Sequence, residues 1–379
     1  MGDTSDKSIV YQDQITKVAK ALRRAQAIYL LSGAGMSANS GLKTYNDIAN
    51  VPQYTKNKIE YHDLCDSELE TTNPKLFWGF WGQCAESYKE AIPHQGYLIL
   101  KKWRDEICAK ESNQEFKKSI LKQYKKLYKL DVDDKIPKAI PTCFFSYTSN
   151  VDGLFLKAGF SSSELLEIHG NCLKLQCKNE DCNYIYDYPD DFNIQNNEEL
   201  LATNVEDLPK CPLCNTIPRP HVMMFDDEDF VPIQEQYDNY DIWEEALEDV
   251  LCSKDDYSCV MLEIGCGMKV LSIKYESEAV LGDILTHYIP TEITRSLPQR
   301  SPEFLLKKVL LVRINIEKGS YLDYYQEWND TKVDYDFRLN IIDIVGNAEQ
   351  VLCDIDNELY ILKELDGDTL SEIENKQQE

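Results

Sequence analysis

Four short runs of apolar residues, each ending in small or polar residues, divide the chain. They cover residues 27–31, 139–147, 259–264 and 309–316. Runs of this length, rich in β-branched and aromatic residues, predict buried strands. Before and between these runs, apolar residues recur at helical spacing, first over residues 14–27. Strands that alternate with helices predict an α/β fold with a doubly wound, Rossmann-like parallel sheet, which binds its ligand along the carboxyl ends of the strands.

Three other segments complete this pattern. Aromatic residues such as Trp78, Trp81 and Tyr88 follow Asn73–Pro74 and predict a helix that packs in a core. Residues 101–138 are rich in lysine but keep helical apolar spacing, which predicts a solvated helical insertion. The chain after residue 356 is polar and acidic, and we expect a partly disordered tail there.

Composition and charge limit the classes of protein to consider. With 379 residues, 43% of them hydrophobic, the chain can bury a large core. A net charge of −26 argues against nucleic-acid binding and weakly favours a basic partner such as a Lys-rich peptide, although solubility alone also explains it. Thirteen cysteines, with no apolar signal or membrane-spanning run, predict an intracellular protein that does not enter membranes. The sequence has no basic localisation cluster, so cytoplasm is preferred to nucleus.

The first predicted strand runs directly into a glycine-rich segment. Gly33 and Gly35 lie one residue apart, and Ala38 follows three residues later. Such a spacing allows a tight turn, close approach of the backbone to a pyrophosphate, and the start of a helix whose N-terminus faces the anion. The alternative is an ordinary glycine-rich turn, because this motif alone is not specific.

Polar and small residues also follow the other predicted strands. Ser149, Asn150 and Asp152 follow the second strand, whereas Gly265 and Cys266 follow the third. The fourth carries Asn315 near its end. Because the carboxyl ends of parallel strands share one edge of a sheet, we expect these residues around one crevice.

His169 ends an apolar, strand-like run that breaks at Gly170. A lone histidine is more often structural than catalytic. Here it lies between the predicted nucleotide crevice and a cysteine-rich segment, where a group with a pKa near neutrality can act as a general base. We therefore predict a catalytic role for His169.

Two cysteine pairs predict a structural zinc site. Cys177 pairs with Cys182, and Cys211 pairs with Cys214, each across a short turn. Four thiolates leave no coordination position for water, so the expected ion is structural and not catalytic. Cys172 lies near enough to compete as a ligand but has no partner at turn spacing.

These motifs, taken in order, resemble the sirtuins, the NAD-dependent protein-lysine deacylases. The matching segments are Gly33-Ala34-Gly35-Met36-Ser37, Thr148-Ser149-Asn150-Val151-Asp152, Ile168-His169-Gly170, the four cysteines, Pro220-His221-Val222-Met223-Met224-Phe225, and Gly346-Asn347-Ala348. The resemblance covers residues 14–355.

The resemblance implies that the chain consumes NAD, transfers the acyl group of a modified lysine to ADP-ribose, and releases nicotinamide. His169 would take a proton from a ribose hydroxyl, and Asn150 and Asp152 would hold the ribose and the nicotinamide amide. The residues implied to bind the nucleotide are Gly33, Ala34, Gly35, Ser37, Tyr45, Ser149, Asn150, Asp152, Gly265, Cys266 and Asn315. Substrate peptide would pair with the strand that carries Val222, Met223, Met224 and Phe225.

Three departures from the family pattern leave other functions open. Asn46 stands where the family has an arginine associated with deacylation, Ser149 replaces a glutamine, and Cys266 replaces a threonine. Loss of a charged donor from a desolvated site costs about a hundredfold in rate. ADP-ribosyl transfer, NAD hydrolysis, and non-catalytic NAD binding or scaffolding are therefore alternatives to deacylation.

The predicted domains follow from these assignments. We expect an N-terminal tail over residues 1–13, an NAD-binding domain over 14–170 and 215–356, a zinc-binding module over 171–214, and the acidic tail over 357–379. The oligomeric state is not encoded in any of these motifs.

Overall fold

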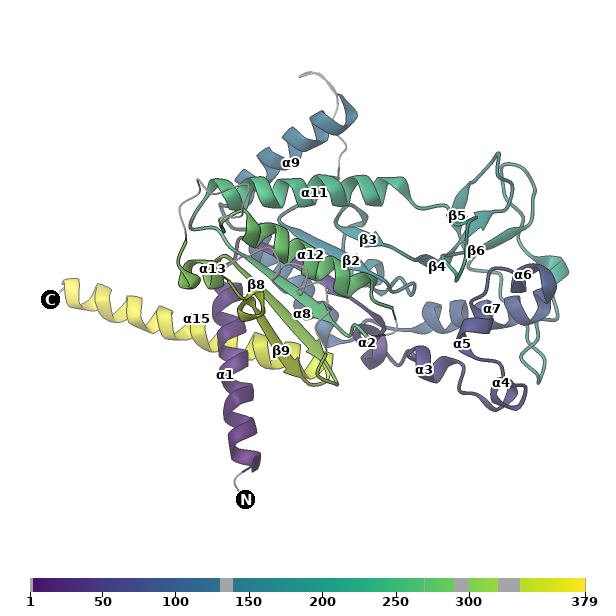
Figure 1. Cartoon of the computed structure of the whole chain (residues 1–379), viewed down its shortest axis with the longest axis horizontal. Helices are drawn as coiled ribbons and strands as arrows, with labels where there is room; N and C mark the ends of the chain where they lie inside the picture. The colour runs from purple at the N-terminus through teal and green to yellow at the C-terminus, as the bar shows by residue number, and fades with distance from the viewer. Residues whose placement is uncertain (1–2, 130–138, 269, 290–299, 320–334, 379) are drawn as a thin grey trace.

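The computed structural model describes residues 3–129, 139–268, 270–289, 300–319 and 335–378, with the backbone alone at residues 3–7, 45–46 and 366–378 (Figure 1). Within these residues, no helix combines the length and the apolar character that a membrane crossing requires.

The larger part of the molecule is built on one sheet of six parallel strands in the order β3-β2-β1-β7-β8-β9. These strands are β1 (Ala27–Ser32), β2 (Phe144–Thr148), β3 (Leu165–Glu167), β7 (Cys259–Ile264), β8 (Val309–Asn315) and β9 (Ile341–Val345). On one side of β1 the strand order runs through β2 to β3, and on the other side it runs through β7 and β8 to β9. The switch point of the sheet, where such folds bind ligands, therefore lies at the end of β1.

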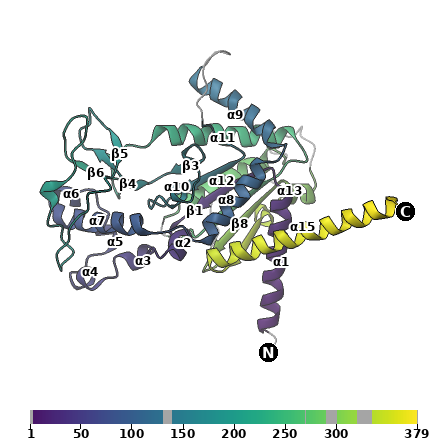
Figure 2. The same ribbon diagram turned by 180° about the vertical axis from the view of Figure 1, so that it is seen from behind.

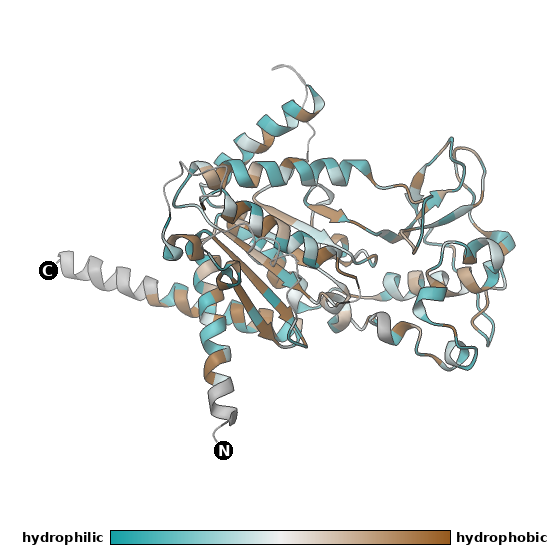
Figure 3. Cartoon of the chain, viewed as in Figure 1, coloured by the Kyte–Doolittle hydropathy of each residue, from teal (hydrophilic) through white to brown (hydrophobic). Residues whose placement is uncertain are grey.

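Helices cover both faces of this sheet, as expected for strands that are apolar throughout. One face is covered by α1 (Asp3–Arg24), α8 (Gln95–Cys108) and α15 (Ala348–Gln378), and the other by α11 (Gln234–Ser253) and α12 (Ser272–Thr286) (Figures 1 and 2). α9 (Asn113–Tyr128) packs on α11, and α13 (Pro302–Lys308) leads into β8. Figure 3 shows the apolar strands between these amphipathic helices.

A second, smaller unit is built around an antiparallel sheet of three strands in the order β5-β4-β6. Its elements are β4 (Gly170–Cys177), β5 (Ile185–Asp187), β6 (Pro218–Val222), α4 (Pro52–Lys56), α5 (Tyr61–Leu64), α6 (Leu69–Thr72) and α7 (Pro74–Glu90). They share a separate hydrophobic core that includes Tyr54, Phe77, Trp81 and Leu175. This core draws on residues 49–88 as well as on the cysteine-bearing segment, and so extends beyond the predicted bounds 171–214.

Short helices connect these elements near the strand ends. They are α2 (Ala34–Ser37), α3 (Tyr45–Ile48) and α10 (Leu154–Lys157), with 3₁₀ turns at Ala38–Ser40, Ser162–Glu164, Val205–Asp207 and Phe337–Asn340.

The predicted strands are confirmed, with the second beginning at Phe144 instead of residue 139. Three other predictions are corrected. The lysine-rich stretch is helical, but it is not solvated throughout: Trp103 and Ile107 of α8 and Phe116 and Ile120 of α9 are buried in the main core. Residues 130–138 of that stretch lie outside the described residues. The expected tails are also helical, since α1 begins at Asp3 and α15 continues to Gln378.

Candidate functional site

The carboxyl ends of β1, β2, β7 and β8 surround a cavity of about 340 Å³. Each strand leads into a segment that the sequence marks as a candidate site. The lining includes Gly33, Ala34 and Gly35 after β1, Ser149 after β2, Gly265 and Cys266 after β7, and Asn315 at the end of β8. The structure therefore brings together seven of the predicted nucleotide-binding residues.

The glycines in this lining allow two loops to pack backbone against backbone. The N–H of Gly33 donates to the Ile264 carbonyl at 3.0 Å, and the N–H of Gly35 donates to the Gly265 carbonyl at 2.9 Å. A Cβ added at Gly35 would lie 2.7 Å from Gly265 Cα, and Gly265 itself has a φ of +66°. These two N–H groups are therefore used within the protein, and the glycines serve first to join the loops after β1 and β7.

Asn315 has a similar connecting role. Its side-chain amide donates to the Cys266 carbonyl at 2.8 Å and its side-chain oxygen accepts from the Ile316 N–H at 2.8 Å. The buried Cys266 thiol donates to the Ile264 carbonyl at 3.5 Å. Both residues line the cavity while they fix the turn after β7.

A second cavity of about 290 Å³ adjoins the first and shares Ala34, Ser149 and Val270 with it. Its lining combines polar residues of the large unit with apolar residues of the small one. These are Ser37, Asn150, Asp152 and His169 on one side, and Ile48, Tyr61, Cys65, Trp81, Tyr88 and residues 222–225 on the other. The two cavities thus meet where the two units face each other.

A hydrogen-bonded network fixes Asp152 and Asn150 in this cavity. The Ser37 hydroxyl donates to Asp152 Oδ2 at 2.5 Å, and Asn150 Nδ2 donates to Ser37 Oγ at 3.1 Å and to the Gly33 carbonyl at 3.0 Å. Tyr97 of α8 reaches Ser37 Oγ at 3.0 Å. Burial raises the pKa of Asp152, although Ser37 and the Leu154 N–H both donate to its carboxylate.

His169 stands directly after β3, at the edge of the second cavity. Burial lowers the pKa of His169, so its imidazole is neutral at pH 7 and able to accept a proton. Its carbonyl accepts from the Met223 N–H at 2.9 Å. A neutral imidazole beside Asn150 and Asp152 is an arrangement suited to general base catalysis.

Two residues of α11 hold the segment that leads to His169. Gln236 accepts from the Glu167 N–H at 2.9 Å and donates to the Glu167 carboxyl group at 3.3 Å, and Tyr237 donates to the Ile168 carbonyl at 3.4 Å. Burial raises the pKa of Glu167 to about 7. Gln236 and Tyr237 were not predicted, because only the fold brings α11 beside β3.

The predicted peptide-binding strand ends earlier than expected, since β6 stops at Val222. The following N–H groups all donate within the chain: Met223 to His169, Met224 to the Asp227 carboxylate at 3.1 Å, and Phe225 to the Cys65 carbonyl at 2.9 Å. A peptide strand added beside this segment would therefore have to donate its own N–H groups to the carbonyl groups of the segment.

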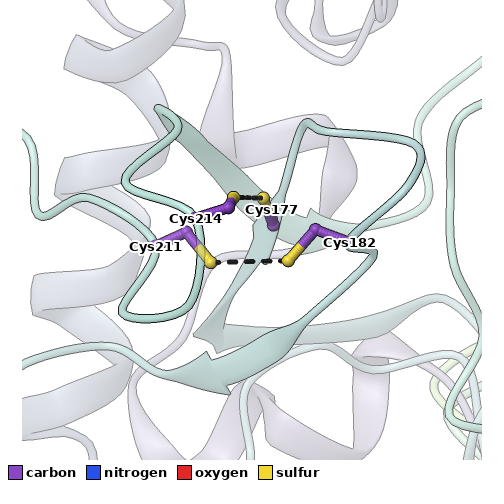
Figure 4. Close-up of side chains that lie close together, drawn as sticks. All are labelled: Cys177, Cys182, Cys211 and Cys214. Carbon is purple, nitrogen blue, oxygen red and sulfur yellow. Dashed lines mark hydrogen bonds between the residues drawn. The ribbon is translucent and has the colours of Figure 1, made fainter.

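The four predicted cysteine ligands form one cluster (Figure 4). Their Sγ atoms all lie within 4.8 Å of one another, with 3.3 Å between Cys177 and Cys214 and 3.8 Å between Cys182 and Cys211. Sulfurs around a tetrahedral zinc ion are separated by about 3.8 Å, because each Zn–S bond is about 2.3 Å long. Cys172 is not part of the cluster, since its buried thiol donates to the Trp81 carbonyl at 3.8 Å.

Beneath the first cavity lies a buried charge cluster that sequence reasoning missed. Lys274 and Arg313 contact the Glu263 carboxylate at 2.9 and 3.0 Å, and Arg313 also contacts Glu278 at 2.5 Å. All four side chains are at most 5% exposed. The available signal was Glu263 itself, a charged residue inside an otherwise apolar strand. The side chains of Tyr45 and Asn46 lie outside the described residues.

A parallel, doubly wound sheet with a cavity at its switch point defines an α/β protein of Rossmann-like class, to which a four-cysteine unit is added. Comparison with known proteins shows which family the chain resembles. A model of the Sir2 family matches residues 134–247. An NAD-dependent protein deacylase of Pyrococcus abyssi is 30% identical over 212 residues, which are 56% of this chain and 65% of the relative. NAD-dependent protein deacylase 2 of Pseudomonas aeruginosa is 25% identical over 214 residues, or 56% of this chain and 66% of the relative.

The matched region thus spans just under two thirds of the length of these relatives. The crystal structure of a Sir2 homologue in complex with NAD has a TM-score of 0.50 at 15% identity, over 91% of this chain and 94% of that chain, and shows that the fold is shared. The chain is therefore similar to the Sir2, or sirtuin, family over residues 134–247 and shares the fold of a Sir2 homologue.

Proposed function

We propose that this chain is an NAD-dependent protein-lysine deacylase. The observation that carries the proposal is the position of His169, a neutral and largely buried imidazole on the cavity that adjoins the nucleotide cavity. Ser149 lines both cavities, so a molecule that fills the first can present one end to His169. The names of the two relatives support the same assignment.

The first cavity fits a dinucleotide in position and lining. It lies at the switch point of the sheet, and six glycines and three alanines in its lining leave backbone accessible to a ligand. We assign nucleotide binding to Gly33, Ala34, Gly35, Ser37, Tyr45, Ser149, Gly265, Cys266 and Asn315. When bound, NAD would supply the ribose carbon that receives the acyl oxygen, with nicotinamide as the leaving group.

The polar residues of the second cavity would then orient the bound NAD and take a proton from one of its ribose hydroxyl groups. Asn150 has its side-chain amide fixed by the Gly33 carbonyl and Ser37, so its orientation is set before any ligand arrives. Asp152, held by Ser37, would bind the nicotinamide end. His169 Nδ1 or Nε2 would accept the proton of a ribose hydroxyl as the acyl group moves to it.

The apolar wall of the second cavity would accommodate an acylated lysine. Tyr61, Trp81 and Tyr88 line it, and a lysine loses its charge on acylation, so such a side chain can enter an apolar site. The backbone of residues 222–225, which borders the cavity, would bind the peptide on either side of that lysine.

The cysteine cluster would hold one structural zinc ion through Cys177, Cys182, Cys211 and Cys214. The donor set and its spacing fit a closed tetrahedral site with no open position. This ion would order the smaller unit, since all four ligands come from the segment around β4, β5 and β6. On this basis we propose a large NAD-binding domain with a zinc-binding module inserted between residues 171 and 214, which shares one core with residues 49–88.

We also propose that the protein works inside the cell, with cytoplasm preferred to nucleus. A chain with thirteen cysteines, none of them in a disulfide in the described structure, suits a reducing compartment.

Nicotinamide release from NAD, measured with and without an acetyl-lysine peptide, tests the proposed function. Release that requires the peptide, and that His169→Ala lowers at least a hundredfold, is expected. His287→Ala is the matched control, because His287 is an exposed histidine that lines neither cavity. Equal release without peptide would instead support NAD hydrolysis or ADP-ribosyl transfer, which the sequence departure at Asn46 favours. Thermal stabilisation by NAD without any release would support a non-catalytic binder.

A further inference from the structure

Two cysteines outside the zinc-type cluster lie in contact with each other. Cys108 is the last residue of α8, and Cys143 immediately precedes β2. Their Sγ atoms are 3.6 Å apart, with the Cys143 thiol donating to the Cys108 sulfur. Cys143 is fully buried, whereas Cys108 is half-buried.

The hydrogen bond from Cys143 favours a thiolate on Cys108. Its sulfur lies 3.0 Å from the oxygen of the Thr142 hydroxyl, which donates its proton to Glu164 in a hydrogen bond, and Glu164 is paired with the Arg104 guanidinium at 2.8 Å. The hydrogen bond from Cys143 is the main cause that lowers the pKa of Cys108, with smaller contributions from Thr142 and Arg104, and it outweighs the opposing effects of burial and of the Glu164 carboxylate. The same bond and burial raise the pKa of Cys143.

The two thiols therefore differ in role. Cys108 is the more acidic and the more accessible, as required of a sulfur that attacks an oxidant. Cys143 is protonated, shielded and in contact with it, as required of a sulfur that resolves the oxidised product. A pair of buried structural cysteines would show neither the difference in exposure nor the polar surroundings on one side only.

We propose that Cys108 and Cys143 form an oxidation site that converts a hydroperoxide into an intramolecular disulfide. The Cys108 thiolate attacks one peroxide oxygen, so that an S–O bond forms, the O–O bond breaks, and the departing oxygen leaves as water or alcohol after taking a proton. The Cys143 sulfur then attacks Cys108, so that the S–S bond forms and the S–O bond breaks, and the second oxygen leaves as water with the proton of Cys143. Both sulfurs are oxidised and the peroxide is reduced.

The Cys108–Cys143 disulfide would join the end of α8 to the start of β2. The opposite ends of these two elements lie at the candidate site. α8 begins near Tyr97, which contacts Ser37, and β2 ends before Asn150. The cysteines themselves line neither cavity, so the site does not depend on the proposed deacylase activity. A covalent link between α8 and β2 raises the unfolding temperature, because it restricts the unfolded chain.

The test uses the full chain loaded with zinc and treated with one equivalent of hydrogen peroxide. After remaining thiols are alkylated, peptide mapping by mass spectrometry is expected to show the Cys108 and Cys143 peptides linked, and dithiothreitol is expected to separate them. Cys143→Ser is expected to leave a sulfenic acid at Cys108 that dimedone traps. Cys108→Ser is expected to slow oxidation of Cys143 at least tenfold.

Cys252→Ser is the matched control, because Cys252 is also half-buried and is expected to leave the disulfide unchanged. Circular dichroism and the unfolding midpoint establish that each variant folds, and the mapping of the unmodified chain does not depend on any variant. Oxidation spread over other cysteines before Cys108, or a Cys108 sulfenic acid that persists while Cys143 is intact, would overturn the proposal.

Discussion

Ser37 donates a hydrogen bond of 2.5 Å to the Asp152 carboxylate and thereby joins the segment after β1 to the segment after β2. Both side chains are buried, at 2% and 5% exposure. The same hydroxyl oxygen accepts from Asn150 Nδ2 at 3.1 Å. One serine therefore sets the positions of the two polar residues closest to the proposed chemistry.

Ser37→Ala is expected to lower the rate of nicotinamide release by about 10- to 100-fold, because a hydrogen bond to a charged group contributes about 1.5–3 kcal/mol. The effect should appear in kcat/KM, and the unfolding temperature should fall as well, because the same buried hydrogen bond contributes to the stability of the fold. Ser87→Ala is the control, since the exposed Ser87 bonds only to the Gln83 carbonyl within its own helix. An unchanged kcat/KM in Ser37→Ala would show that Asp152 is positioned without it.

The zinc assignment predicts that substitutions at Cys177 and Cys172, which lie five residues apart in the sequence, differ in their effects on zinc content and stability. Cys177→Ser is expected to abolish stoichiometric zinc and to lower the free energy of unfolding by several kcal/mol, because structural zinc binding is coupled to folding. Cys172→Ser should keep one zinc per chain, since Cys172 contacts Trp81 and not the cluster. Native mass spectrometry gives the stoichiometry. No zinc in the freshly purified chain, or its loss from Cys172→Ser instead, would contradict the assignment.

The sheet and the cysteine cluster could be predicted because each follows from a local pattern. An apolar run such as residues 259–264 can only be a buried element, and its end at Gly265 marks the edge of the sheet. The pairs at Cys177 and Cys211 are likewise defined by spacing within one turn. Such signals need no knowledge of which distant segments meet.

Contacts between distant segments could not be predicted in the same way. The apolar faces of α8 and α9 have ordinary amphipathic spacing among many lysines, and nothing local distinguishes a core helix from a solvated insertion. Trp81 was correctly expected in a core, but its place on the cavity wall depends on how the two units face each other. The role of Gln236 beside Glu167 likewise depends on the position of α11.

The acidic residues between α11 and α12 predict that stability falls as pH rises. Burial, and then the neighbouring carboxylates of Glu276, Glu248, Asp283 and Asp241, raise the pKa of Glu244 to about 8. Since this folded-state pKa lies above the unfolded value of about 4.3, the folded chain binds the extra proton and is stabilised at low pH. That stabilisation is lost between about pH 4.5 and pH 8.

Chemical denaturation at several pH values checks this expectation. Glu244→Gln should reduce the loss of unfolding free energy over this pH window by about 1 kcal/mol or more, because the amide remains neutral throughout. Glu303→Gln is the control, as Glu303 is exposed and paired only with Lys307 four residues away. An equal slope in the unchanged chain and in Glu244→Gln would mean that the carboxylate is already ionised at low pH.

The buried charge cluster beneath the first cavity predicts that loss of its arginine, Arg313, lowers the free energy of unfolding more than loss of an arginine in an exposed ion pair. Arg313 lies between Glu263 and Glu278, so Arg313→Met would bury two carboxylates beside each other with only Lys274 and Ser277 to compensate at Glu263. Removal of one partner from a buried ion pair costs about 3–5 kcal/mol. Arg338→Met should cost at most about 1 kcal/mol, because the Arg338 pair with Asp336 is exposed. Urea denaturation measures both, and a cost for Arg313→Met no greater than for Arg338→Met would show that water reaches the cluster and screens its charges.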